Sequence, residues 1–180
     1  MSELGVWAKP VIVGSLVTLR PYSAGDAGAV WEMVHDPEGN DLTGTTATFT
    51  RAQIDEWVAS RPVADERLDL AIVETATGEF AGEVVINDFD SEAKSANFRI
   101  ALRGPDWYGR GLGGEATELV ASHVFETIGL NSLTLDVRAD NVRAIRAYER
   151  AGFARTGETD ADGHTWVDME LTREQWEAGR

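Results

Sequence analysis

The sequence predicts an α+β fold in which a mixed, mostly antiparallel twisted sheet of about six to seven strands is flanked by helices on both faces. Short apolar segments typical of strands follow one another in the middle and at the end of the chain, and turn residues separate them. Amphipathic helical patterns lie near the N-terminus and after a glycine-rich stretch. With 180 residues, 43% of them hydrophobic, we expect one domain over residues 1–180, with its core at about 16–172.

The N-terminal part of the chain predicts one strand and two helices. Residues 16–20 form the strand, with residues 11–13 as a lead-in. A helix over residues 23–35 begins at a capping serine, and a helix over residues 50–60 begins with a capping box. Residues 38–49 are polar, rich in glycine and threonine and without a clear period, so we predict a loop.

The remaining elements follow from periodicity and turn residues. An amphipathic helix follows the glycine-rich stretch and ends at Gly129, and Asn141 caps a shorter helix that ends at Gly152. The strands before and after the longer helix run parallel, because strand–helix–strand forms one right-handed crossover. The predicted strands of this part cover residues 68–74, 79–87, 95–102, 133–138, 153–158 and 165–171.

The glycine-rich stretch, residues 107–116 with the sequence WYGRGLGGEA, is the first candidate for a binding site. It lies between an apolar strand and a helix and contains Gly109, Gly111, Gly113 and Gly114. Glycine lets the backbone approach a ligand closely, and the first N–H groups of a helix have no partner within the helix. Those donors and the helix dipole favour a phosphate, so the stretch predicts a pyrophosphate site for a nucleotide-bearing cofactor.

Two other interpretations of this stretch stay open at this point. Residues 109–114 also satisfy G-x-G-x-x-G, and Asp136 lies about where a dinucleotide fold places its ribose-binding acid. Against that interpretation, residues 103–108 separate the glycines from their strand, and too little chain follows to build a second mononucleotide-binding half. The other alternative is a turn whose glycines only permit tight packing.

A second motif, residues 141–153 with the sequence NVRAIRAYERAGF, helps to choose between these interpretations of the glycine-rich stretch. It is similar to the N-x-x-A/S-x-x-x-Y-x-x-x-G-F signature of the GCN5-related N-acetyltransferase (GNAT) superfamily. The loop resembles that family's Q/R-x-x-G-x-G/A acyl-CoA motif, except that Tyr108 replaces Gln or Arg. An aromatic residue followed by Gly-x-Gly and later by Glu-Ala resembles the branch that acetylates ribosomal-protein N-termini.

The resemblance implies acetyl-CoA as the donor. The two parallel strands would splay apart, and the pantetheine amides would pair with the backbone of Ile100 and Leu102, as an extended peptide adds to a strand edge. The ADP part would lie against the glycine loop and Arg110. The implied cofactor-binding residues are Ile100, Leu102, Tyr108, Gly109, Arg110, Gly111, Leu112, Gly113, Gly114, Asn141 and Arg146.

Direct acylation of an amine needs a base for the amine and a proton donor for the departing thiolate. Tyr148 matches the family tyrosine beside the sulfur, and a phenol is protonated at neutral pH. Asp136 stands where the N-terminal acetyltransferases often carry Glu, so it is the candidate base. Asn97 lies where other relatives place Glu, and a carboxamide cannot act as a base. Glu83 and Asp88 are the fallback bases.

The resemblance therefore predicts an acyl-CoA-dependent N-acetyltransferase whose acceptor is a primary amine, on a protein N-terminus or on a small molecule. The rival is a non-catalytic acyl-CoA-binding or sensing module. The oligomeric state stays open, and a homodimer is one of the alternatives. The net charge of −15 favours a cationic acceptor if acidic residues line the site. The acids expected near the acceptor are Asp41, Asp55, Glu56, Asp88, Asp90 and Glu92.

Composition excludes several other classes. There is no cysteine, which excludes disulfides and a thiolate nucleophile and suits a cytoplasmic protein. A net charge of −15 argues against nucleic acid as a partner, because phosphate contacts need Lys and Arg. No apolar run approaches the ~20 residues that span a membrane, and no motif predicts a metal site.

Overall fold

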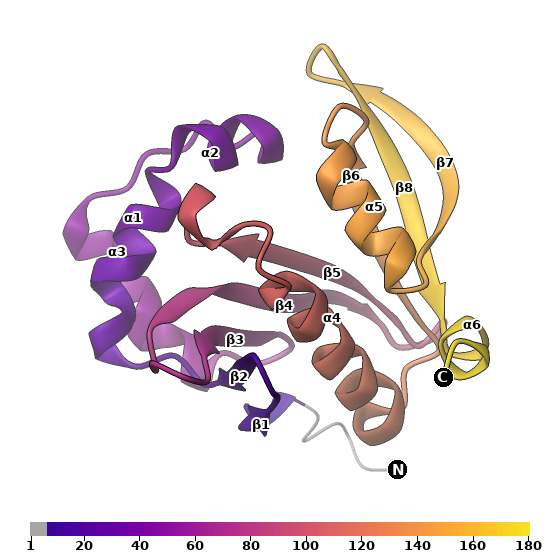
Figure 1. Cartoon of the computed structure of the whole chain (residues 1–180), viewed down its shortest axis with the longest axis horizontal. Helices are drawn as coiled ribbons and strands as arrows, with labels where there is room; N and C mark the ends of the chain where they lie inside the picture. The colour runs from indigo at the N-terminus through magenta and orange to yellow at the C-terminus, as the bar shows by residue number, and fades with distance from the viewer. Residues whose placement is uncertain (1–6) are drawn as a thin grey trace.

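The computed structural model describes residues 7–180, and at its centre lies one eight-stranded mixed sheet (Figure 1). Its strand order is β1-β2-β3-β4-β5-β6-β8-β7, and every neighbouring pair is antiparallel except β5 and β6. The predicted fold class is confirmed, with one strand more because the lead-in segment pairs as a strand of its own. The strands are β1 (Ile12–Val13), β2 (Val17–Arg20), β3 (Leu68–Glu74), β4 (Phe80–Asp90), β5 (Ser95–Leu102), β6 (Ser132–Arg138), β7 (Ala154–Ala161) and β8 (His164–Thr172).

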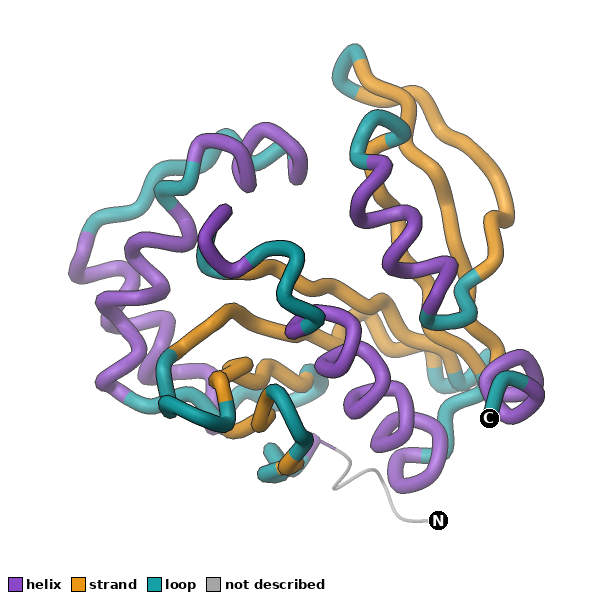
Figure 2. Tube along the Cα trace, viewed as in Figure 1, coloured by secondary structure: helices purple, strands orange, loops and turns teal. Residues whose placement is uncertain are grey.

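The helices lie on both faces of this sheet (Figure 2). After α4 the helix continues as a π-helical segment, His123–Ile128. This segment ends at Gly129, whose φ of 84° is the left-handed conformation expected at a helix C-terminus. Between residues 7 and 180, no helix is long and apolar enough to cross a membrane. The helices are α1 (Ala27–Val34), α2 (Pro37–Thr43), α3 (Arg51–Ser60), α4 (Leu112–Ser122), α5 (Val142–Arg150) and α6 (Arg173–Ala178).

Two apolar clusters hold the helices to the sheet. The larger lies under α4 and α5, where Ala116, Val120 and Ile145 are buried against strand residues such as Phe98. The smaller lies on the other face, where Val30 of α1 and side chains of α3 pack against β3 and β4. Every second residue of β6 belongs to the larger cluster, so its alternate residues face the side of the sheet that carries α1 and α3.

The sheet opens between its two parallel strands. β5 and β6 pair only from Ser95–Ser132 to Asn97–Thr134. Beyond that point β5 stays paired with β4 as far as Leu102, while β6 stays paired with β8 as far as Arg138. Figure 1 shows the two strands diverging, with α5, β7 and β8 on the side of β6. The edge of β5 that faces β6 is therefore free over residues 98–102, which is the splay that the resemblance implies.

Two helices were not predicted. The loop expected over residues 38–49 is wrong for its first part, because residues 37–43 form α2. Asp36 caps this helix by accepting a hydrogen bond from Gly39 N, Pro37 occupies its first turn, and Gly44 ends it with a φ of 67°. We predicted that Pro37 ends the helix over residues 23–35, but this proline instead begins α2. The C-terminal α6 has its own capping box at Thr172.

Candidate active site

The glycine-rich stretch forms the turn that opens α4. Gly109 and Gly111 have φ values of 69° and 79°, a conformation that side chains disfavour. Gly111 is the N-cap residue of α4, and no side chain caps the helix. The N–H groups of the first turn therefore stay available for an anion, as the sequence analysis expected.

Glu115 lies in that first turn, where a carboxylate would compete with a phosphate. Its oxygens instead accept hydrogen bonds from the backbone N–H groups of Ser15, Leu16 and Val17, at 3.0, 2.7 and 2.7 Å. The acid thus ties α4 to the segment before β2. Its charge is already engaged by three donors, which lowers its competition with an anion at the helix start.

The residues around the glycines are partly engaged with one another. Arg110, predicted to contact the ADP part, forms an ion pair with Glu74 and lies 5.1 Å from the Trp107 ring centroid. The guanidinium of Arg143 on α5 lies 3.9 Å from the ring centroid of Tyr108. Leu112 is buried in the core, so only its backbone can face a ligand. Two cationic side chains thus lie beside the loop, one on each side of it.

Ile100 and Leu102 lie on the free part of β5 and point toward α4. A Cβ atom added to Gly113 would be 3.8 Å from the Cδ1 atoms of both residues, which is ordinary van der Waals contact. An added Cβ at Gly114 would meet nothing within 4 Å. The free edge of β5 and the start of α4 therefore form a continuous surface that an extended ligand can follow.

Two predicted cofactor-binding residues lie on α5. Asn141 is the N-cap residue, and its side chain accepts a hydrogen bond from Ala144 N at 3.3 Å. Arg146 is exposed, and within residues 7–180 it forms no ion pair. Asn141 therefore has a structural task in this arrangement, while Arg146 is free to contact an anion.

Tyr148 projects from α5 toward the opening between β5 and β6. Its ring packs edge-on against Phe98, at 6.2 Å between centroids, and lies 5.8 Å from Phe153. Burial, and secondarily the negative charge of Asp136, raise the pKa of Tyr148 to about 12. The fold thus brings the two candidate catalytic residues within electrostatic reach of each other, although they come from different elements and opposite faces of the sheet.

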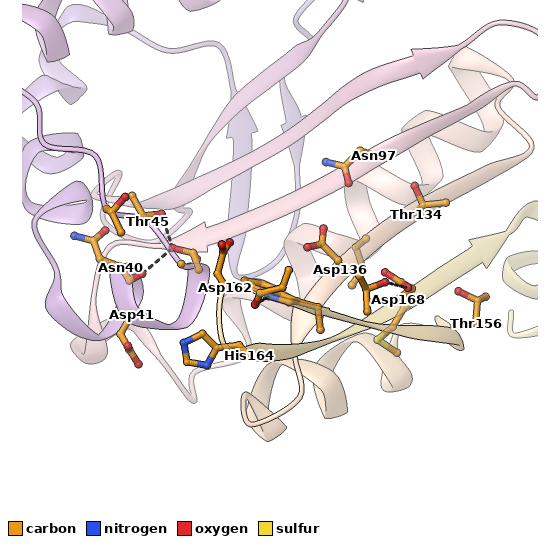
Figure 3. Close-up of a pocket in the computed structure, with 18 of the residues that line it drawn as sticks. Asn40, Asp41, Thr45, Asn97, Thr134, Asp136, Thr156, Asp162, His164 and Asp168 are labelled. Carbon is orange, nitrogen blue, oxygen red and sulfur yellow. Dashed lines mark hydrogen bonds between the residues drawn. The ribbon is translucent and has the colours of Figure 1, made fainter.

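Asp136 is exposed on β6 and lines a cleft of about 1170 Å³ (Figure 3). The cleft lies between the end of α2, the residues that follow α2, and the β6–β8–β7 part of the sheet. Asp168 faces Asp136 across the β6–β8 ladder and accepts a hydrogen bond from Thr159. Asp41, Asp162 and Glu170 also line the cleft, and no Lys or Arg does. Its electrostatic field therefore favours a cation.

Asn97 and the two fallback bases, Glu83 and Asp88, lie elsewhere or have another partner. Asn97 lines the cleft and donates a hydrogen bond to Asn87 at 2.9 Å. Glu83 is buried under α1 and α3, where Tyr22 donates a 2.6 Å hydrogen bond to it, and burial raises the pKa of its carboxyl. Asp88 is exposed near the end of β4. Neither of these acids lines the cleft, so Asp136 is the predicted base that the structure places there.

Most of the acids expected near the acceptor are not at the cleft. Of the six, only Asp41 lines it; the others lie on α3 or at the far end of β4 and in the turn after it. Neighbours along the sequence do not identify β8 as the partner of β6, and two acids of β8, Asp168 and Glu170, line the cleft. The missed signal is alternation: polar residues occupy every second position of two otherwise apolar strands. These are Thr134, Asp136 and Arg138 on β6, and Asp168 and Glu170 on β8.

No group of three or more His, Asp or Glu side chains within the described part of the chain could hold a metal ion. The arrangement offers instead an anion site at the start of α4, a free strand edge and an acidic cleft. The free edge of β5 runs from the anion site to the acidic cleft. Tyr148 and Asp136 lie beside the point where these two sites meet.

Comparisons with known proteins agree with this arrangement. Residues 17–154 match a family model described as an acetyltransferase (GNAT) domain. Among curated relatives, the spermidine N(1)-acetyltransferase of Escherichia coli K12 is 33% identical over 81 residues, which cover 45% of this chain and 43% of that protein. The ribosomal protein bS18-alanine N-acetyltransferase of Salmonella typhimurium LT2 is 29% identical over 136 residues, covering 76% of this chain and 80% of that protein. The chain thus spans 43% of the length of the first of these relatives.

Solved structures share the fold. Spermidine N-acetyltransferase from Vibrio cholerae, solved in complex with CoA and spermine, has a TM-score of 0.80 at 16% identity, covering 91% of this chain and 99% of that one. An acetyltransferase of the GNAT family from Bacillus anthracis has a TM-score of 0.80 at 16% identity over 92% of this chain and 99% of that one. These likenesses and the family model confirm the resemblance read from the two motifs. The chain belongs to the GNAT acetyltransferase family.

Proposed function

We propose that this protein is an N-acetyltransferase that moves an acetyl group from acetyl-CoA directly to a primary amine held in the acidic cleft. One observation carries the proposal. The sheet opens between β5 and β6 beyond Asn97 and Thr134, so the glycine turn of α4 and the cleft share one opening, with Tyr148 and Asp136 beside it.

The donor site fits acetyl-CoA in its shape and in its available donors. The uncapped first turn of α4 suits a pyrophosphate, and the free edge of β5 near Ile100 and Leu102 suits the pantetheine amides. Bound acetyl-CoA supplies an acyl group activated as a thioester. The proposed contacts are the backbone of residues 109–114, the edge of β5, and the side chains of Tyr108, Arg110, Asn141 and Arg146. In this arrangement Arg110 would exchange its contact with Glu74 for a phosphate.

In the reaction, Asp136 takes a proton from the acceptor ammonium through a water molecule, because most amines are protonated at neutral pH. The free amine nitrogen attacks the thioester carbonyl carbon, and the carbon–sulfur bond breaks as the carbon–nitrogen bond forms. The nitrogen then releases its surplus proton, which reaches the departing thiolate through water, so that the products are the amide and the free thiol of CoA. The Tyr148 hydroxyl points its proton at the departing sulfur. The chain has no cysteine, so no thiol of the protein takes the acyl group on the way.

The raised pKa of Tyr148 decides how it acts. A phenol with a pKa of about 12 is a weaker acid than a thiol, whose pKa is about 8.5. Tyr148 therefore stabilises the developing thiolate by donating a hydrogen bond, and full proton transfer is uphill. When Asp136 has accepted the amine proton, its negative charge disappears and one cause of the raised pKa disappears with it.

The acceptor that the cleft favours is a small cationic amine. Five acids line the cleft: Asp41, Asp136, Asp162, Asp168 and Glu170. A polyamine can place one amine at Asp136 and a second ammonium near the other carboxylates. The relatives named as spermidine acetyltransferases support this class. A peptide N-terminus is the second candidate, supported by the ribosomal-protein relative that aligns over the larger share of the chain.

A panel of acceptors separates these possibilities and the non-catalytic rival. We would incubate the protein with acetyl-CoA and with spermidine, spermine, an aminoglycoside or a peptide beginning with alanine. Free thiol and acetylated product would both be measured. We expect turnover with at least one cationic small amine, with thiol and product in equal amounts. Binding of acetyl-CoA without turnover of any amine would favour a binding or sensing module.

A further inference from the structure

We infer that Arg138 is a positioning residue for the amine acceptor, because it fixes α2 in place as one wall of the cleft. The inference rests on the proposed function, since it assigns a part of the acceptor site of that same reaction. It concerns a residue that the chemical steps above do not use. Arg138 does not line the cleft and acts through the helix that does.

α2 lacks the apolar packing that holds the other long helices. None of its residues is buried, its cap at Asp36 is local, and at its other end a Cβ added to Gly44 would lie 3.4 Å from the ring of Trp166 on β8. Yet Asn40, Asp41 and Thr43 line the cleft, as do the residues immediately after α2 (Figure 3). The position of this wall must therefore be set by polar contacts with the opposite side of the cleft.

Arg138 supplies a buried contact of this kind. It is the last residue of β6, two residues beyond Asp136, and only 5% of it is exposed. Its Nη1 donates a 2.5 Å hydrogen bond to the carbonyl oxygen of Asp41 and lies 3.3 Å from a carboxylate oxygen of the same residue. Its Nε and Nη2 donate to the carboxylate of Asp140, which fixes the plane of the guanidinium. The guanidinium of Arg138 therefore connects β6, the strand that carries the proposed base, to α2 on the facing side of the cleft.

Two other polar contacts join α2 or its cap residue to neighbouring elements, and both are longer. Arg143 lies 3.8 Å from Glu38, and both side chains are about half exposed, at 50% and 48%. Tyr108 donates to Asp36 at 3.5 Å. Exposed pairs of this kind contribute little, because water and salt screen them. Arg138 is therefore the main determinant of the distance between α2 and β6.

This distance determines where the acceptor amine sits relative to Asp136. A misplacement of about 1 Å can cost a bound substrate up to about a hundredfold in rate. The donor site lies on the other side of the opening, against α4 and β5, and its link to α2 is the 3.5 Å hydrogen bond from Tyr108 to the cap residue Asp36. Loss of Arg138 should therefore raise KM for the acceptor and leave the dissociation constant of acetyl-CoA unchanged.

The test compares Arg138→Met and Arg138→Lys with the wild type. Met keeps much of the side-chain volume, and the carboxylates it leaves, on Asp41 and Asp140, are 70% and 62% exposed and can hydrate, so the fold should persist. For the best acceptor of the panel above, we expect Arg138→Met to raise KM by about tenfold or more. The dissociation constant of acetyl-CoA should change by less than about twofold. Backbone amides of residues 39–45 should exchange with solvent faster.

The KM and the amide exchange of Arg138→Lys should lie between those of the wild type and of Arg138→Met, because lysine keeps the charge but not the planar guanidinium. Arg180→Met is the matched control: it removes an exposed ion pair with Glu126, away from the cleft, and should change none of these quantities. An unchanged KM and unchanged exchange at residues 39–45 in Arg138→Met would overturn the inference. So would equal losses for acceptor and acetyl-CoA, which indicate a general structural role. If the wild type acetylates no amine, the proposed function fails, and the exchange of residues 39–45 alone then decides whether Arg138 clamps α2.

Discussion

At the scale of single residues, the two proposed catalytic groups differ in their surroundings. Tyr148 is packed among aromatic rings, and Asp136 stands exposed in the cleft. Both residues were predicted from the family resemblance, because Tyr148 matches the family tyrosine and Asp136 stands where relatives often carry Glu. The sequence could not show that Asp136 contributes to the raised pKa of Tyr148, because this contact joins a helix and a strand on opposite faces of the sheet.

Tyr148→Phe tests the proposed donor. The variant keeps the ring and its packing, and within the described residues the hydroxyl forms no hydrogen bond, so thermal stability should barely change. We expect kcat to fall by about 10²–10³-fold, the usual effect of removing one hydrogen-bond donor to a charge that develops in the transition state. The affinity for acetyl-CoA should stay the same, which calorimetry can measure. A folded variant with unchanged kcat would make Tyr148 a core aromatic residue.

The pKa of Tyr148 also predicts the shape of the pH profile. Because the pKa is raised to about 12, the hydroxyl keeps its proton well above neutral pH, and only near pH 12 would its ionisation remove the donor. In the wild type, kcat should therefore show no alkaline decline below about pH 10 that is absent from Tyr148→Phe. A decline centred near pH 9 and lost in the variant would contradict the assignment.

Glu83 provides a residue-scale test of the fold itself. Its pKa is raised above 4.5 by burial, so the folded state holds the proton more tightly than the unfolded chain does. The wild type should therefore lose stability as pH rises from 4.5 through the folded-state pKa. Glu83→Gln keeps an acceptor for Tyr22 but cannot ionise. The free energy of unfolding of Glu83→Gln, minus that of the wild type, should increase between pH 4.5 and 7.5 in urea titrations; a constant difference would contradict the burial argument.

At the scale of elements, the sequence predicted the strands and long helices but missed α2 and α6. The long elements can be recognised in the sequence because the apolar residues of their buried face recur at a regular period. α2 has no such face: none of its seven residues is buried, and polar contacts from distant parts of the chain hold it. Its capping signals, Asp36, Pro37 and Gly44, were present in the sequence, and Pro37 was interpreted as the end of α1.

The start of α4 offers the test at this scale. Gly113 has an ordinary helical backbone, and a Cβ there would make only van der Waals contact with Ile100 and Leu102. Gly113→Val should therefore fold, while its methyl groups occupy the space proposed for the donor. We expect the dissociation constant of CoA to rise by about tenfold or more, or ~1.4 kcal/mol. The control is Gly28→Ala in α1, where an added Cβ meets nothing within 4 Å. Equal CoA affinity in both variants and the wild type would make the glycines packing residues only.

At the scale of the whole molecule, part of the net charge of −15 lies at the cleft, which is lined by five acids and no Lys or Arg, although Arg138 pairs with one of the acids, Asp41. The sequence showed the charge but not its location, because pairing of β6 with β8 is a long-range feature of the sheet. A cationic acceptor should be attracted by this field. Raising the salt from roughly 0.05 to 0.5 M should lower kcat/KM for spermidine, because the Debye length shrinks. A peptide with neutral neighbours should show little change; equal salt effects for both would mean that the field does not steer the acceptor.

The central claim is that a carboxylate in the cleft deprotonates an amine beside the opening of the sheet. The most direct measurement is the pH dependence of acetyl transfer by the wild type and by Asp136→Asn, with the best acceptor of the panel. We expect the variant to be slowest relative to the wild type at low pH, where few amines are free, and the difference to shrink as pH approaches the amine pKa. An equal loss at every pH, or equal rates for the two proteins, would contradict it.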